Sequence, residues 1–273
     1  MKTHVEGVDM MKRSFGIAAV CDILFFVCGI LRGGDDNADL ARSLCRRFDD
    51  GNYETRYQLN QSMYKSVLGN TYFRDTRWTD ADGTKFYRHE IWKNGKLDCI
   101  KIRNAEGFFD VFPEIRTAIK RPAPLPEEDL SGVTSYEMRS CTHDGVDAWE
   151  IKKTIPITEE TFQLVDKSRR NMPYYDAASM REAFFNQWAA TSLYYVDKQN
   201  GLPLALKCFN RNGKQVSALV YRDSKPLREF PQSAFTIPET YIVERPATDD
   251  DFEYIMRRTW ISIQRARRKA EKK

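Results

Sequence analysis

The sequence predicts a mainly β protein built on one continuous antiparallel sheet. From residue 53 onward, short runs rich in aromatic and β-branched residues follow one another, with turn-forming residues between them. Three such runs within 193–221 are separated by Asn200-Gly201 and Asn212-Gly213, and Asn-Gly accepts the positive φ angles of tight turns. Each pair therefore predicts a two-residue hairpin, and the three runs predict a meander of adjacent antiparallel strands.

Residues 1–34 match a secretory signal peptide. Lys12 and Arg13 precede the apolar run 15–31, and Gly33-Gly34 follows it. Positive charge, an apolar stretch and small residues at its exit are typical of such a signal. The run is also close to the shortest length that crosses a bilayer, so an uncleaved N-terminal anchor is the alternative.

A helix over 37–49 is expected next, followed by the first strands. The helix is ended by Gly51, and its apolar residues share one face: Leu40, Leu44, Cys45 and Phe48. The strand-like runs after it are 53–59, 64–68, 71–78, 85–92, 97–103 and 107–112, with turn signals at Gly69-Asn70, Asp82-Gly83 and Asn94-Gly95. The prolines in 122–126 cannot continue a hydrogen-bonded ladder and predict a loop, after which 133–141 and 146–154 predict two more strands.

Residues 158–190 predict a helical insertion before the meander. Thr158 and Asp176 are suited to cap two helices, because their side-chain oxygens accept hydrogen bonds from the first free backbone amides. The second helix is expected to end at Trp188, and its apolar residues have helical spacing: Met180, Phe184, Phe185 and Trp188.

The chain is expected to end with a short strand near 235–238 and a helix from Asp249. Thr248 is the expected N-cap of this helix. Its single apolar stripe consists of Phe252, Ile255, Met256, Trp260 and Ile263.

The sequence offers no recognisable catalytic, metal or cofactor motif. After the apolar N-terminal run only His89 and His143 remain, and the sequence contains no zinc-protease, serine-hydrolase or phosphate-loop motif. We therefore expect no catalytic residues, no metal ligands and no cofactor. Four cysteines follow the N-terminal segment, and they allow one or two disulfides or only buried thiols, with the pairing open: Cys45, Cys99, Cys141 and Cys208.

Positive charge is concentrated at the C-terminus. Between Arg257 and Lys273 there are eight basic residues and one acidic residue, a local charge of +7, which leaves −3 for the rest of a chain of net charge +4. A solvated helix end is one explanation, since cations are favoured at the negative end of the helix dipole. Contact with an anionic membrane surface is the functional alternative. Nucleic acid is not expected as a partner, because the rest of the chain lacks a basic face.

Aromatic residues are the remaining clue to function. They are spread along the strands, where the simplest explanation is that they fill an ordinary core. On a strongly curved sheet, however, the concave face leaves room for an acyl chain, and each buried methylene contributes ~0.8 kcal/mol. We therefore take six of them as candidate lipid-binding residues: Tyr57, Tyr72, Trp92, Phe109, Trp149 and Tyr195.

Several of these segments also resemble a known family. An aromatic strand at 194–198, the turn 201–204 and the Asn-Gly-Lys hairpin at 212–214 are similar to LolA-like outer-membrane lipoprotein-sorting proteins, as are 145–151 and 235–238. The resemblance implies an incomplete antiparallel barrel covered by helices over 35–246, and a protein of the periplasm or cell envelope that binds lipid or lipoprotein acyl chains. The insertion 158–190 is longer than the family pattern, and the basic helix 247–273 is an addition to it.

Three functions follow from these observations. The first is an exported half-barrel that binds lipid or lipoprotein acyl chains. The second is an envelope scaffold or protein-interaction module whose barrel is filled by its own aromatic residues. An enzyme is the third, and it requires a polar cleft that holds His89 or His143 beside a carboxylate.

Overall fold

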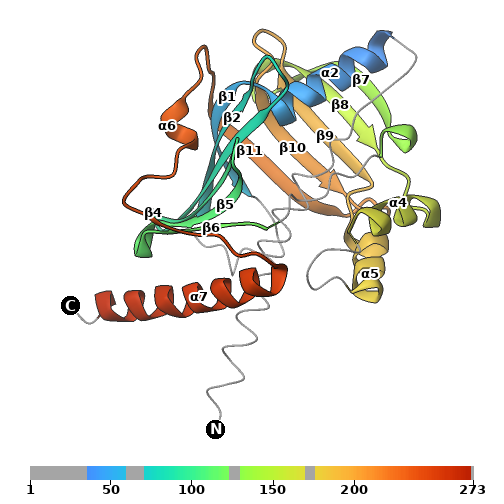
Figure 1. The fold of residues 1–273 in the computed structure, drawn as a ribbon. Helices are drawn as coiled ribbons and strands as arrows, with labels where there is room; N and C mark the ends of the chain where they lie inside the picture. The colour runs from blue at the N-terminus through green and yellow to red at the C-terminus, as the bar shows by residue number, and fades with distance from the viewer. Residues whose placement is uncertain (1–35, 60–70, 123–129, 170–175, 272–273) are drawn as a thin grey trace.

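A computed structural model describes residues 36–59, 71–122, 130–169 and 176–271, and places all their strands in one curved sheet (Figure 1). Its strands are β1 (Tyr53–Leu59), β2 (Thr71–Thr79), β3 (Lys85–Lys93), β4 (Lys96–Asn104), β5 (Gly107–Phe112), β6 (Thr117–Lys120), β7 (Ser135–His143), β8 (Val146–Thr154), β9 (Thr191–Asp197), β10 (Pro203–Phe209), β11 (Gln215–Pro226) and β12 (Ile242–Glu244). Their order is β12-β6-β5-β4-β3-β2-β1-β11-β10-β9-β8-β7. The edge strands β12 and β7 do not pair, so the predicted incomplete barrel is confirmed.

Neighbouring strands are antiparallel, with one exception. β1 pairs with both β2 and β11, and thereby joins the first half of the sheet to the meander β9-β10-β11. The short strand β12 instead runs parallel to β6. β6 and β12 are not consecutive in the chain, and the segment after β11 carries the chain from the middle of the sheet to this edge.

The turns explain why the predicted meander is right while its two-residue hairpins are wrong. Only Gly201 and Gly213 have positive φ in the two Asn-Gly pairs. The Asp197 amide bonds the Leu202 carbonyl and the Asn210 amide bonds the Lys214 carbonyl, so both loops are longer than two residues. Side chains hold them: the Asn210 carboxamide oxygen accepts from the Lys214 amide at 3.0 Å, for example. By contrast, Asn94 and Gly95 both have positive φ, as a two-residue turn requires.

The described helices are α2 (Asp36–Asp50), α4 (Glu159–Arg169), α5 (Ala177–Gln187), α6 (Gln232–Phe235) and α7 (Asp249–Glu271). The predicted caps are present: Thr158 accepts from the Thr161 amide, Asp176 from the Ala178 and Ser179 amides, and Thr248 from the Asp251 amide. None of the described helices is long and apolar enough to span a membrane.

The short strand predicted near 235–238 is wrong. Phe235 ends α6 and packs on Phe86 and Phe230, and residues 236–238 have no regular structure. Pro231 and Pro238 bracket this segment, and proline has no amide to donate to a ladder. The chain rejoins the sheet only at β12.

Several predicted elements lie outside the described residues. They are the signal or anchor segment 1–34, the run 64–68 with Gly69-Asn70, and most of the proline-rich loop 122–126.

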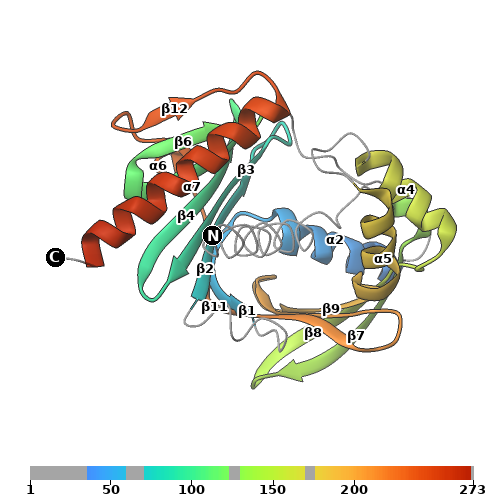
Figure 2. The same cartoon turned by 90° about the horizontal axis from the view of Figure 1, so that it is seen from below.

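Helix α2 crosses the hollow side of the sheet and forms the main core with it (Figure 2). Its buried residues are Ala41, Leu44, Cys45 and Phe48, as the predicted stripe requires apart from Leu40. They pack on residues of β1, β2 and β8–β11, among them Tyr57, Phe73, Tyr194, Val196, Leu206 and Tyr221. Separate clusters lie between α4 and α5 and between α7 and β5–β6.

Phe48 is expected to contribute most of the stability that α2 adds. The Phe48→Ala variant should lower the free energy of unfolding by about 3–5 kcal/mol, because it leaves a cavity among aromatic rings. Leu40→Ala is the matched control on the same helix, since Leu40 is 45% exposed, and it should change stability by less than about 0.5 kcal/mol. Urea unfolding measures both, and equal losses would contradict the placement of α2.

Candidate functional site

The strand register divides the sheet into an inner and an outer face. Residues paired across neighbouring strands point to the same face, and successive residues alternate between the two. We define the inner face as the one that contacts α2; it carries Tyr57, Phe73 and Tyr221, which are paired across β1, β2 and β11. The outer face is the opposite, convex side of the sheet.

The structure distributes the six candidate lipid-binding residues over both faces. Tyr57 and Trp149 lie on the inner face, with the α2 core. The other four point to the outer face: Tyr72, Trp92, Phe109 and Tyr195. The six therefore do not line one cavity, because an aromatic pattern in sequence does not tell which face a residue takes.

The inner face under α2 is an aromatic layer. The Phe48 ring meets the rings of Tyr194 and Tyr221 edge-on, with centroids 5.0 and 5.1 Å apart. Tyr57 stacks on Phe73 with a centroid distance of 5.3 Å. All five rings are buried, and such aromatic contacts add to the hydrophobic gain from burial. In this part of the sheet the chain's own side chains fill the hollow.

A buried polar cluster continues the inner face on β2 and β3. Asp75 accepts a 2.8 Å hydrogen bond from the Arg77 guanidinium, and its other oxygen lies 2.8 Å from Nδ1 of His89. The hydroxyl of Tyr57 lies 3.4 Å from the same nitrogen. The sequence held a signal for the Asp75–His89 pair, because both residues are equally distant from Asp82 in the predicted turn.

The cluster keeps Asp75 charged and its neighbouring phenols neutral. Burial alone would raise the pKa of Asp75, but the charge of Arg77 and the hydrogen bond with His89 outweigh it, so the pKa is lowered. Burial raises the pKa values of Tyr57 and Tyr221 well above their ordinary value. His89 thus lies beside a carboxylate, as an enzyme would require, but its side chain is only 1% exposed, so this pair lines no polar cleft.

The outer face carries two smaller groups of contacts. On β1–β3, the Arg56 guanidinium lies 4.0 Å from the Tyr72 ring centroid, and Tyr72 stacks on Trp92. On β7–β10, His143 stacks on Tyr195 at 4.2 Å. Burial and the hydrogen bond with Glu150 raise the pKa of Tyr195 to about 12. These contacts engage three of the candidate residues with neighbouring side chains.

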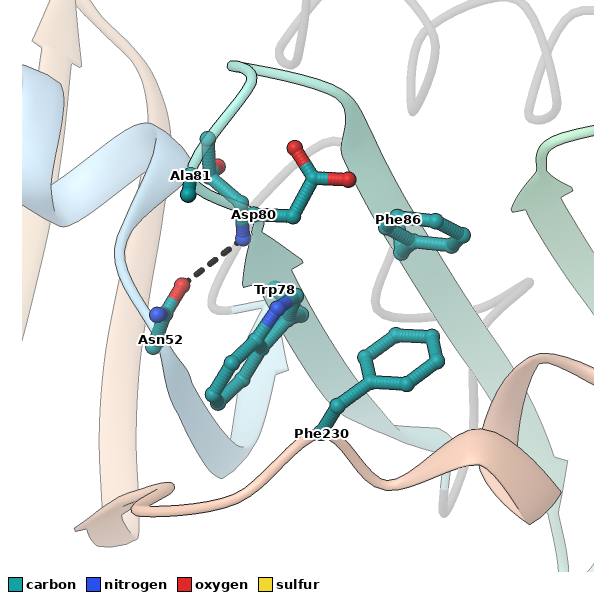
Figure 3. Close-up of a pocket in the computed structure, with 7 residues that line it drawn as sticks. Asn52, Trp78, Asp80, Ala81, Phe86 and Phe230 are labelled. Atoms are coloured by element: carbon teal, nitrogen blue, oxygen red, sulfur yellow. Dashed lines mark hydrogen bonds between the residues drawn. The ribbon is translucent and has the colours of Figure 1, made fainter.

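An apolar pocket of about 540 Å³ opens on the outer face where the chain returns after β11 (Figure 3). Its walls are Trp78 on β2, Phe86 on β3 and Phe230 from the returning segment, with Phe230 5.9 Å from Trp78 and 4.8 Å from Phe86 between ring centroids. Asn52 accepts from the Thr79 amide at 2.7 Å and fixes the rim, which Asp80 and Ala81 complete.

Sequence reasoning missed this pocket. Trp78 and Phe86 were recognisable as strand aromatics, and the register about Asp82 pairs them directly. Phe230 lies in no strand, and only the path of the segment after β11 brings it to Trp78 and Phe86. A phenylalanine directly before Pro231, outside any strand-like run, was the one available signal in the sequence.

Metal and thiol chemistry find little support in the described part of the chain. No group of three or more histidine, cysteine or acidic residues there could hold a metal ion. No disulfide joins Cys99, Cys141 and Cys208. Burial raises the pKa of Cys208 to about 11, which keeps this thiol protonated near neutral pH.

The polar cluster predicts a pH dependence of stability. The pKa of Asp75 is lowered in the folded state, so its contribution is complete above the ordinary carboxyl pKa of about 4 and is lost as the pH falls through the lowered value. Asp75→Asn should therefore cost about 3 kcal/mol at pH 7 and progressively less in acid. Denaturant unfolding at several pH values tests this, with the exposed Asp82→Asn as control. A cost that did not shrink in acid would contradict the prediction.

Comparison with known proteins gives structural similarities only. No protein-family model and no curated protein matches the chain. Among similar solved structures, an uncharacterized conserved protein from Thermus thermophilus shares 12% sequence identity over 76% of this chain and 99% of its own, with a TM-score of 0.45. MucB of Pseudomonas aeruginosa, solved with MucA, shares 11% identity over 75% of this chain and 62% of its own, with a TM-score of 0.44.

A LolA superfamily protein from Nitrosomonas europaea shares 11% identity over 74% of this chain and 98% of its own, with a TM-score of 0.33. The family that the sequence resembles is thus also found among the similar structures. Identities and TM-scores this low assign no function.

Proposed function

We propose that the protein binds the acyl chain of a lipid or of a lipid-modified protein in the cell envelope, with the pocket of Trp78, Phe86 and Phe230 as the acyl site. The observation that carries this proposal is an apolar volume of about 540 Å³ walled by three aromatic rings. That volume lies within the range of about 300–1,000 Å³ that small-molecule sites occupy. Each methylene placed against the rings would contribute ~0.8 kcal/mol without any directional chemistry.

The rim of the pocket constrains the ligand. Asp80 lies at the opening, and its carboxylate accepts hydrogen bonds from the backbone amides of Asp82 and Thr84 at 3.1 and 2.7 Å. These bonds fix the negative charge in place, and a like charge nearby is unfavourable. We therefore expect an esterified or amide-linked acyl chain to bind better than a free fatty acid.

The inner face is a second place for an acyl chain only if α2 moves. As long as Phe48 contacts Tyr194 and Tyr221, the space above β9 and β11 is occupied by the chain itself. The lipid-binding role of Tyr57 and Trp149 stays a prediction that depends on such a movement, and that of the four outer-face candidates stays a prediction as well.

The packing of α2 into the inner face favours one alternative function. An inner face filled by α2 is what the second hypothesis requires, in which the barrel is a scaffold that presents its surfaces to other proteins. A scaffold would take up no apolar ligand, and this difference separates the two functions.

Binding of an apolar fluorescent probe tests the acyl site. Delipidated protein should bind the probe N-phenyl-1-naphthylamine saturably, and an acyl methyl ester should displace it at lower concentration than the free acid. Phe230→Ala should raise the Kd about tenfold, because one aromatic wall of roughly 1.5 kcal/mol is lost.

Tyr254→Ala is the matched control for this experiment. Tyr254 is an exposed aromatic residue on α7 and does not line the pocket, so its loss should leave the Kd unchanged. Absence of saturable binding by a folded protein would overturn the acyl site and leave the scaffold function.

A further inference from the structure

The outer side of α7 gathers exposed apolar residues and arginines on one stripe. The opposite side of the helix is fixed on the sheet: Phe252, Ile255, Met256 and Ile263 pack against Phe112 and Ile119. Arg267 also binds this region, through ion pairs with Asp98 and Glu114. The helix is thus held in one rotational setting, with its predicted apolar stripe turned inward except for Trp260, which is outside the cluster.

Tyr254 and Ile261 occupy the middle of the outward side. They are seven residues apart, which is about two helical turns, and they therefore share one face. Tyr254 is 68% exposed and Ile261 is 50% exposed. At about 100° per residue, both lie opposite the buried Ile263. Large apolar side chains in this position are not needed for the core.

Arginines flank this apolar pair on both sides. Arg257, Arg258, Arg265 and Arg268 are all exposed and fall at helical spacings from Tyr254 and Ile261. Arg257 binds Glu253 and Arg258 binds Glu244 of β12. Arg265 and Arg268 make no ion pair with any of the described residues, so their charges face solvent.

The neighbouring strand β12 adds to the same surface. Ile242 and Glu244 are paired with Thr117 and Ile119, so they point to the side of the sheet on which α7 packs. Glu244 reaches Arg258 on the helix, which joins the two elements. Ile242 is nevertheless 68% exposed. Figure 2 shows β12 and α7 at the same end of the sheet, and the ion pair between Glu244 and Arg258 connects them.

We propose that this surface, formed by the outward side of α7 with Ile242 of β12, docks the protein on an anionic phospholipid surface. Arginines near such a surface each contribute about 1 kcal/mol, and Tyr254 and Ile261 enter the headgroup region between them. Tyr254 and Ile261 would gain nothing from contact with the phosphates of a nucleic acid, whereas a membrane can bury them. A membrane is therefore the favoured partner. A second copy of the chain would bring the same arginines face to face, because a two-fold interface is self-complementary.

Vesicle co-sedimentation of the full chain tests this proposal, with pure phosphatidylcholine vesicles compared with vesicles that also contain phosphatidylglycerol. The ratio of the two affinities is the readout, because an apolar N-terminal segment would bind both kinds of vesicle. We expect the anionic vesicles to be preferred at least about tenfold at low salt, and less so at high salt.

The variant Arg265→Glu/Arg268→Glu should abolish this preference. Arg46→Glu/Arg228→Glu is the matched control, since both are exposed arginines outside α7 and the change in net charge is the same. Tyr254→Ser/Ile261→Ser should weaken anionic-vesicle binding about tenfold without changing binding to duplex DNA.

Equal loss in the control variant, full binding by Arg265→Glu/Arg268→Glu, or binding to DNA without a preference for anionic vesicles would each overturn the proposal. The docking surface is independent of the acyl pocket. Phe230→Ala should therefore keep the vesicle preference whether or not it loses the probe.

Discussion

The packing of α2 into the curved sheet is the interaction on which the rest of the structure depends. A sheet that bends this strongly exposes a wide inner face, and its aromatic residues need a partner that matches the curvature. The amphipathic helix α2 supplies it for β1, β2 and the meander, with small residues such as Ala41 allowing close approach and Phe48 reaching the rings of β9 and β11. This core contains residues of β1, β2 and the meander β9-β10-β11. It therefore holds the first half of the sheet and the meander at a fixed angle.

The two faces therefore have different roles. The inner face combines an aromatic layer with a buried charge cluster, in which the loss of one partner would leave an uncompensated buried charge. Asp75 meets His89 only when β2 and β3 pair in the observed register. The outer face has a buried cluster of its own, in which Phe109 packs with Ile102, and there the returning segment also creates the pocket.

Much of this architecture could be predicted from the sequence, because its signals are local. The strand runs, the cap residues Thr158, Asp176 and Thr248 and the stripe of α2 depend only on near neighbours in the chain. The parallel pairing of β12 with β6 could not be predicted, since it joins segments more than a hundred residues apart. The helical turn at Phe235 was mistaken for a strand because apolar content alone does not separate the two.

The candidate site was harder to predict than the fold for the same reason. Period-two alternation tells which residues share a face, but it does not tell which face is hollow. The assignment of Tyr72 and Phe109 to a concave cavity therefore depended on which set of alternating strand residues faces the concave side. The sequence does not tell this. Phe230 shows the opposite case, because it forms one wall of the pocket although its segment has no strand or helix periodicity.

The shortness of β12 has a consequence for solubility. An unpaired strand edge is a template for hydrogen bonding with other chains, and proteins often blunt it with a short final strand. β12 covers β6 with only three residues and is followed at once by α7, which packs over Ile119. A chain cut before Ile242 would lose both protections together, and the bare backbone of β6 would become a seed for aggregation.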